Sequence, residues 1–547
     1  MANNTRSPLW RKQAVMLVLA SALIAGCSGN TGNNNNSAVN TGTPTNSAAP
    51  SPGDSSASSE PISLTYWTGL NAFAARSLKE YGESLFYQEL EKRTNVKVKF
   101  EHPAVGSEAE QFNLLIASGK LPDVIEYNFT TYPGGPEKAI SDKVIIPLND
   151  IVEQHAPNLK AYLDANPEMK KEISTDNGTI YAFPALGTGN SNVSSGLVLR
   201  KDWLDELGLG VPETIEEWTN VLTQFKEKKG AKTPLTMTLA EFKSERFNGA
   251  FGIGIGFYLD GGQVKYGPIE PGYKDYLTQL NAWYKDGLLD PDFATQDGAA
   301  KDAKATNGSA GAFPAFIGSA MGKYLTANKD SNPAYDLVAA QHPVLNKGEE
   351  PRFFTAAYDY RGENSAGITP ANKNAERTAA WLDYLYSEEG NLLKSFGVEG
   401  TTYSLEGDYP KYTDLIVNNP DGLSIGDAMA KYLRVSTPSP GFVGDDRYTE
   451  QYYSFDQQKH AVKLFNQYYD NLKDTRLPRV TPTVDEGQEL SSIMAEVNTY
   501  FEEMFMQFVM GAAPIAEFDG YTAQLKKMGI ERAIEIYQSA YERYMKR

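Results

Sequence analysis

Cysteine and histidine, which serve most often as nucleophiles, acid–base groups and metal ligands, are few and widely spaced in this chain. The chain has 547 residues, with one cysteine and four histidines. The histidines are His102, His155, His342 and His460, and none of them has a partner at the spacing of a metal-binding His-x-x-x-His pair. The sequence contains no Gly-x-Ser-x-Gly nucleophile elbow and no phosphate-binding loop. It therefore predicts a binding protein and not an enzyme, although two carboxylates alone would serve a glycosidase.

The single cysteine follows a segment with the composition of a signal peptide. Three basic residues precede an apolar run at 14–25, which is too short to span a bilayer as a stop-transfer helix. Ile24-Ala25-Gly26-Cys27 places a small-residue cleavage site directly before the cysteine and resembles a lipobox. We predict that 1–26 is a lipoprotein signal peptide and that the sulfur of Cys27 carries a diacylglyceryl group. An ordinary secretory signal is the alternative.

The residues after the cysteine have the composition of a tether. Segment 27–60 is almost entirely Ser, Asn, Gly, Thr, Ala and Pro, which cannot bury enough apolar surface to fold. The full chain carries a charge of −18, and removal of three basic residues with the signal leaves −18 − 3 = −21. So acidic a body is a poor partner for nucleic acid or an anionic membrane surface. We expect it at the extracellular face of the cell membrane, attached through the lipid alone.

The residues after the tether alternate between strand and helix patterns. Apolar strand patterns at 62–66, 96–101 and 121–127 are separated by helical stretches, which predicts βαβ units and a mostly parallel sheet. Ligands bind such sheets at the carboxyl ends of the strands. The candidate ligand residues at such ends are Trp67, Glu126 and Tyr127, together with Tyr66. For Trp67, a position in the core is the alternative. Helical patterns follow at 376–396, 491–510 and 521–546.

The stretch 173–183 predicts a hairpin. Its centre is Asp176-Asn177-Gly178, and Asn-Gly favours a type I′ turn because both residues tolerate positive φ. Asp176 and Asn177 are also weak candidates for a calcium loop. The spacing of a full EF-hand is missing, so we expect a turn and no obligatory cofactor.

Several longer motifs resemble family 1 extracellular solute-binding proteins, above all the long lipoproteins that serve carbohydrate ABC permeases. The resemblance covers essentially all of 61–547. It lies in Asp260-Gly261-Gly262-Gln263-Val264-Lys265-Tyr266, in Tyr284-Lys285-Asp286-Gly287-Leu288-Leu289-Asp290-Pro291-Asp292-Phe293, in Asn372-Lys373-Asn374-Ala375-Glu376-Arg377, in Leu382-Asp383-Tyr384-Leu385-Tyr386-Ser387-Glu388-Glu389-Gly390 and in Gln538-Ser539-Ala540-Tyr541-Glu542-Arg543-Tyr544.

The resemblance implies an α/β, two-lobed, periplasmic-binding-protein-like (type II) fold with a hinge. Each lobe would hold a mostly parallel sheet flanked by helices, one lobe at 61–183 plus 355–402 and the other at 184–354 plus 403–547. An oligosaccharide would bind between the closing lobes of a monomer and pass to the permease. Relatives handle neutral and acidic sugars, and some alginate-binding relatives hold calcium near 172–180, where this chain has a shorter, less acidic loop.

The resemblance also implies further ligand residues. Phe313 and Phe316 occupy positions where relatives have aromatic residues that face the cleft, and Tyr258 and Tyr403 are weaker candidates. Three more lie near the crossover between lobes: Tyr358, Asp359 and Arg361. Arg361 could pair with a uronate carboxylate or form a structural salt bridge. A surface polysaccharide hydrolase, an adhesin and a peptide-binding importer component remain alternatives.

Overall fold

The computed structural model describes residues 60–187, 192–358, 360–435 and 438–547, and these residues form one compact unit. The predicted signal peptide and lipidated Cys27 lie outside the described residues. The predicted tether also lies outside them, except for Glu60. Asp359 is likewise not described. No helix in the described part of the chain is long and apolar enough to cross a membrane.

The first lobe is built on a six-stranded sheet with the order β13-β4-β10-β3-β1-β2. The first three strands confirm the sequence prediction. β1 pairs in parallel with β2 and β3, β13 pairs in parallel with β4, and β10 runs antiparallel to β3 and β4. The strands are β1 Ile62–Trp67, β2 Val96–Glu101, β3 Val124–Tyr127, β4 Phe183–Gly187, β10 Tyr360–Ile368 and β13 Gly441–Val443.

The second lobe contains a smaller sheet with the order β8-β5-β9. These strands are β5 Ser195–Arg200, β8 Ala312–Phe316 and β9 Leu337–Ala340, and both of their pairings are antiparallel. The expectation of mostly parallel pairing was therefore wrong for this sheet. The reason is that the chain enters the second lobe at β5, which runs in the opposite direction to both of its neighbours. β10 does the same in the first sheet. In the described part of this lobe, parallel pairing continues as single bridges from Leu235 to Ala312 and Leu289 and from Thr214 to Val344.

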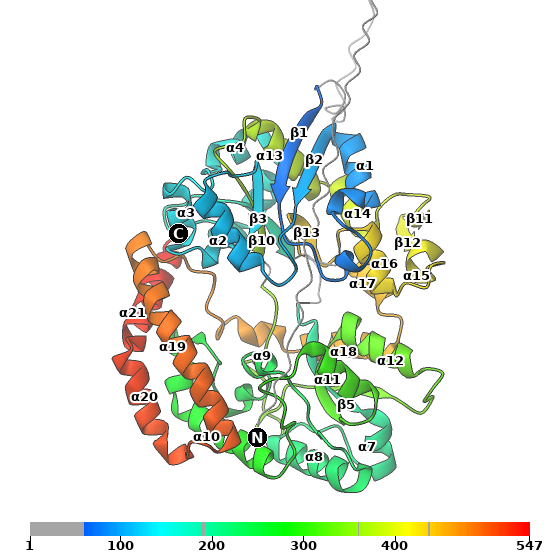
Figure 1. Ribbon diagram of the computed structural model, residues 1–547, viewed down its shortest axis with the longest axis vertical. Coiled ribbons are helices and arrows are strands. Elements are labelled where there is room, and N and C mark those ends of the chain that lie inside the picture. Colours follow the sequence, from blue (N-terminus) through cyan, green and yellow to red (C-terminus); the bar gives the residue numbers. More distant parts are fainter. Residues whose placement is uncertain (1–59, 188–191, 359, 436–437) are drawn as a thin grey trace, which may run out of the picture. The chain divides into compact units, whose positions relative to one another are not determined.

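Helices cover both sheets (Figure 1). α8 shows why such segments are helical: Thr214 and Glu217 form a capping box at its start, and Gly230, in the left-handed region at φ 66°, ends it. The helices before β10 are α1 Leu85–Thr94, α2 Glu108–Ser118, α3 Gly135–Ser141, α4 Asn149–His155, α5 Pro157–Ala165, α6 Pro167–Glu172, α7 Lys201–Leu207, α8 Ile215–Lys229, α9 Leu239–Phe242, α10 Pro271–Lys285, α11 Gly298–Thr306 and α12 Gly322–Asn328.

Two of the three later helices predicted from periodicity are divided in the structure, whereas the third, predicted at 491–510, begins earlier, at Val484. The stretch 376–396 is two helices, because Ser387 caps a new helix after a turn of 3-10 helix, and the stretch 521–546 is broken at Gly529, which has φ 96°. The helices are α13 Ala375–Asp383, α14 Glu388–Phe396, α15 Asp414–Val417, α16 Ile425–Tyr432, α17 Asp446–Tyr452, α18 Asp456–Asn466, α19 Val484–Met510, α20 Phe518–Lys527 and α21 Ile530–Tyr544.

Two hairpins lie outside the main sheets: β6 Phe257–Asp260 with β7 Gln263–Tyr266, and β11 Tyr403–Glu406 with β12 Tyr409–Tyr412. Tyr403 packs in a cluster with Phe396 and Met429, and β13 extends the first sheet. Residues 403–435 and strand β13 therefore pack with the first lobe, which differs from the expected boundary after residue 402. Strand β4 also lies in the first sheet, beyond the expected boundary after residue 183.

The predicted hairpin at 173–183 is reduced to one bridge between Ser174 and Ile180. The amide of Gly178 donates to the carbonyl of Thr175 at 2.9 Å, so the turn spans 175–178. Gly178 has φ 74°, whereas Asn177 is not in the left-handed region. The type I′ prediction was therefore wrong, because that turn needs positive φ at both residues.

The C-terminal helices contact both lobes. α19 has 27 residues, a length of about 40 Å at 1.5 Å per residue. Near its start Gly487 lies against Gly134 of the first lobe, whereas Val497 and Phe505 pack in the core of the second lobe. α21 runs beside α19, drawn in orange to red in Figure 1. Both helices therefore join the lobes independently of the strands.

Candidate functional site

Phe316 is the last residue of β8, at the end of the sheet where β5 begins. Its side chain is 58% exposed, and it is the one aromatic side chain in the described part of the chain that is classed as exposed. Phe313, in the same strand, is fully buried against Tyr324. The two phenylalanines predicted as ligand residues therefore differ: Phe313 packs the core, and Phe316 offers its ring to solvent.

Tyr452 of α17 lies against the backbone just beyond Phe316. A side chain at Gly318 would overlap the Tyr452 ring, and a Cβ at Gly426 would come within 3.1 Å of the Tyr452 hydroxyl oxygen. Tyr448 lies one turn earlier on α17, and both tyrosines are half-buried. We call Phe316, Tyr448 and Tyr452 the aromatic rim.

The aromatic rim draws on both lobes. Gly426 is followed in α16 by Asp427, which forms an ion pair with Arg76 at 2.8 Å. Arg76 belongs to the short helix that follows β1, and its guanidinium lies 4.5 Å from the Phe73 ring centroid. Contacts therefore run continuously from the segment after β1 to the end of β8. Exposed ring faces beside charged hydrogen-bonding groups suit a ligand with apolar faces and many hydroxyl groups.

Trp67 and Tyr127 lie together, as their positions at the ends of β1 and β3 predicted. Trp67 is only 6% exposed, and its ring centroid is 5.9 Å from that of Phe112 and 6.0 Å from that of Tyr127. Tyr127 stacks on Phe112 at 3.9 Å. In this arrangement Trp67 packs an aromatic cluster and presents no free face to a ligand.

Glu126 is buried and fully engaged. Its Oε2 accepts a hydrogen bond from the Tyr66 hydroxyl at 2.8 Å, and its Oε1 accepts one from Arg434 at 3.0 Å. Burial raises the pKa of Glu126, while the positive charge of Arg434 works in the opposite direction. The carboxylate therefore holds the first lobe together and is not free to bind a ligand.

Tyr258 and Tyr358 come together at a cavity of about 270 Å³. Tyr258 packs on Phe353 at 5.2 Å, and the Tyr358 hydroxyl donates to the carbonyl of Leu477 at 3.1 Å. The Arg476 guanidinium lies 4.4 Å from the Tyr358 ring centroid. The cavity lies beside the segment 353–358, which leads from the second lobe into β10.

Two further predicted residues lie elsewhere. Tyr403 is 4% exposed and packs against Phe396 at 6.0 Å, so it belongs to a core. Arg361 pairs through its backbone with Ala185 in the first sheet, and its side chain is outside the described residues.

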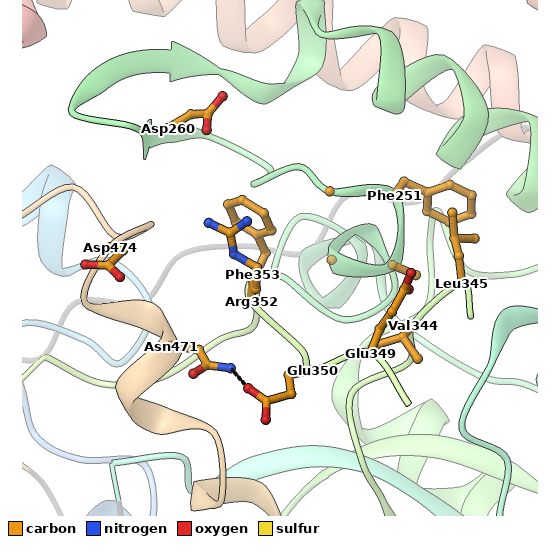
Figure 2. Close-up of a pocket in the computed structure, with 13 residues that line it drawn as sticks. Phe251, Asp260, Val344, Leu345, Glu349, Glu350, Arg352, Phe353, Asn471 and Asp474 are labelled. Carbon is orange, nitrogen blue, oxygen red and sulfur yellow. Dashed lines mark hydrogen bonds between the residues drawn. The ribbon is translucent and has the colours of Figure 1, made fainter. Parts of the chain in front are cut away.

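The larger cavity of Figure 2 has a volume of about 770 Å³ and belongs to the second lobe alone. Its lining comes from 249–260, 344–353 and 471–474. Glu350 accepts a hydrogen bond from the Asn471 side chain at 3.2 Å across the floor, and Phe353 separates this cavity from the smaller one. None of its lining residues belongs to the first sheet, so the two lobes do not share this cavity in the structure.

Asp176 and Asn177 are held by protein groups. The Asp176 carboxylate accepts hydrogen bonds from Arg543 and Arg547, and the Asn177 side chain donates to Glu137 at 3.0 Å. In the described ranges no group of three His, Cys, Asp or Glu side chains could hold a metal ion. The arginines supply the positive charge that a calcium ion would bring.

Sequence reasoning missed Tyr448, Tyr452, Arg76 and Asp427. The only local signal was the spacing of Tyr448 and Tyr452, four residues apart in an otherwise polar segment, which places both on one helix face. Nothing local connects Tyr452 to Gly318, which is 134 residues (452 − 318) earlier in the chain.

Residues 75–392, more than half of the chain, match the family model described as bacterial extracellular solute-binding protein. A fructooligosaccharide ABC transporter substrate-binding protein, FusA of Streptococcus pneumoniae, is 27% identical over 87% of this chain and 90% of its own length. Lipoprotein LipO of Bacillus subtilis is 24% identical over 83% of this chain and 88% of its own length.

Solved structures have the same fold. FusA in complex with kestose matches with a TM-score of 0.71 and 25% identity, covering 88% of this chain and 99% of that chain. The alginate-binding protein AlgQ2, solved without calcium ion, matches with a TM-score of 0.73 and 24% identity, covering 89% and 99%. These structures share the two-lobed α/β architecture of the model.

Proposed function

Because this chain belongs to the bacterial extracellular solute-binding proteins, we propose that it captures an oligosaccharide at the aromatic rim and delivers it to an ABC transporter permease. The observation that carries the proposal is that Tyr452 lies against Gly318, two residues after the exposed Phe316, and against Gly426, next to the Asp427 that pairs with Arg76. The C–H face of a sugar ring stacks on aromatic rings, while its hydroxyls need planar charged or amide partners.

The ligand class follows from the relatives. FusA is described as binding fructooligosaccharides and was solved with kestose, and AlgQ2 is described as binding alginate. A rim formed by both lobes suits capture by closure, since a closed form that binds sugar better than the open form becomes the dominant state. In this proposal 61–187 and 360–443 move with the first sheet and 192–354 with the second. Arg361, on β10, remains a predicted ligand residue.

We further propose that Cys27 carries the lipid that holds the protein at the outer face of the membrane. The lipobox-like sequence before Cys27 and the likeness to lipoprotein LipO support this. A single acyl chain binds membranes only marginally, so stable attachment requires two chains. The lipidated chain would present its body as a monomer close to the permease. No observation favours hydrolase, adhesin or peptide-carrier functions over sugar capture.

A thermal-shift titration of the chain from Ser28 onwards tests the proposal. The ligands are neutral fructooligosaccharides, uronic-acid oligosaccharides and tri- to pentapeptides. A ligand at 100 times its Kd stabilises the folded state by about 2.7 kcal/mol, which shifts the melting curve measurably. We expect a shift with an oligosaccharide and none with peptides. Shifts with peptides alone, or new reducing ends from incubated glycans, would contradict the proposal.

A further inference from the structure

Arg246 is a buried arginine without an ion-pair partner. It is 5% exposed, and no carboxylate of the described residues lies within ion-pair distance of it. Burial lowers the pKa of Arg246 to about 10, so the side chain stays charged at neutral pH. The more distant carboxylates of Glu241 and Glu245 offset only part of this cost. Burying a charge without a close partner is unfavourable, so stability alone does not account for Arg246.

The guanidinium of Arg246 holds one end of the strand beside the aromatic rim. It donates to the Ser195 carbonyl at 3.3 Å and to the Ser195 hydroxyl at 2.9 Å. Ser195 is the first residue of β5 and pairs in register with Phe316. A planar guanidinium that bonds to two oxygens of one residue fixes both the backbone and the side chain of that residue. The position of Ser195 in turn sets the path of β8 where Phe316 leaves the sheet.

The residue before Arg246 is tied to the hinge side of the second lobe. The Glu245 carbonyl accepts hydrogen bonds from the amide and from the hydroxyl of Thr355, both at 3.2 Å. Thr355 lies in the segment 353–358 that leads into β10. Two consecutive residues therefore connect the strand beside the aromatic rim with the segment 353–358.

We propose that Arg246 is a positioning residue for ligand capture: it contacts no ligand itself but fixes Ser195, and through Ser195 the orientation of Phe316. This inference rests on the proposed function of the aromatic rim. Arg246 also transmits movement of the segment around Thr355 to the rim. A lysine at this position keeps the charge but cannot bond to both oxygens of Ser195 in one plane.

The test uses Arg246→Lys, Ser195→Ala and the double variant, with Arg200→Lys as the matched control. Arg200 is a buried arginine at the opposite end of β5, where it pairs with Asp202. Calorimetric titration with the oligosaccharide that stabilises the native chain should give a Kd about tenfold weaker for Arg246→Lys, the equivalent of about 1.4 kcal/mol. The double variant should be no weaker than Arg246→Lys, and Arg200→Lys should keep the native Kd. A native Kd for Arg246→Lys, or additive effects in the double variant, would overturn the proposal.

A second measurement does not depend on ligand. A Phe316→Trp reporter, built into the native chain and into Arg246→Lys, is quenched with acrylamide after circular dichroism has verified folding. We expect a change in emission maximum and quenching constant with Arg246→Lys and none with Arg200→Lys. If no oligosaccharide binds the native chain but the reporter changes, the proposed function fails while the positioning role stands. An unchanged reporter overturns the positioning role.

Discussion

Glu126 and Arg434 form a buried ion pair at 3.0 Å although 308 residues separate them in the chain. The pair joins the end of β3 to the residues that follow α16, and Arg434 also lies 4.3 Å from the Tyr81 ring centroid. The helix that carries Asp427 of the candidate site is thereby attached to the first sheet.

Loss of this ion pair is expected to destabilise the protein strongly. Glu126→Gln leaves Arg434 buried without its counter-charge and should lower the free energy of unfolding by about 3–5 kcal/mol. Urea unfolding followed by circular dichroism measures this. Glu89→Gln, which removes part of a more exposed pair with Arg93, is the control and should cost less than about 1 kcal/mol. Equal effects for the two variants would show that Glu126 is not structural.

Phe316→Ala is expected to weaken oligosaccharide binding about tenfold without loss of stability, because the ring is exposed in the free protein. Calorimetric titration and a melting curve separate the two effects. Phe313→Ala should do the reverse, with an unfolding cost of about 3–5 kcal/mol from the cavity it creates. Val211→Ala, a truncation of another exposed apolar side chain, is the control and should change neither quantity.

His342 should make stability depend on pH. Burial, with a contribution from the charge of Arg246, lowers the pKa of His342 to about 3, compared with 6.5 for the exposed side chain. Between these values the unfolded chain binds a proton that the folded chain does not. Stability should therefore be complete above about pH 6.5 and fall by up to about 1.4 kcal/mol per pH unit as the pH drops towards 3.

The check on this pH dependence is His342→Phe, which keeps a ring against Phe354 and removes the titration. Urea unfolding from pH 7 to pH 4 should show a shallower loss of stability for this variant. His460→Gln, at an exposed position of α18, should keep the native slope. The prediction fails if His342→Phe and the native chain lose stability in parallel.

The turn at Asp176 is expected to depend on arginine and not on a metal ion. Arg547 donates to Asp176 and to the carbonyls of Lys171 and Ser174, at 2.7 and 2.6 Å. Asp176→Asn should lower the free energy of unfolding by about 3 kcal/mol, since the buried guanidinium of Arg547 loses its counter-charge, whereas Arg543 keeps its ion pair with Glu486. Calcium or EDTA should leave the native melting curve unchanged. A fall in melting temperature with EDTA would instead establish a bound metal ion.

Three strands of the first sheet, β1, β2 and β3, were predicted from the sequence because they are short apolar runs between clear helix patterns. The other three strands of that sheet, β4, β10 and β13, were not. The reversed direction of β5 was not predictable from local pattern, since it depends on where the chain crosses between lobes. The indole ring of Trp67 is of a type that stacks on sugar rings, but Phe112 and Tyr127 cover it. Tyr452 carried no such signal, because its role comes from a contact with Gly318 across the fold.

The C-terminal helix α19 has a consequence for how the two lobes lose their structure. Its 27 residues form one uninterrupted helix whose two ends pack in different lobes. Melting of either lobe would remove contacts from a helix that the other lobe still holds. Heating should therefore produce a single calorimetric peak, and the amide protons in the middle of α19 should exchange only through global unfolding. The two lobes are therefore expected to unfold as one cooperative unit.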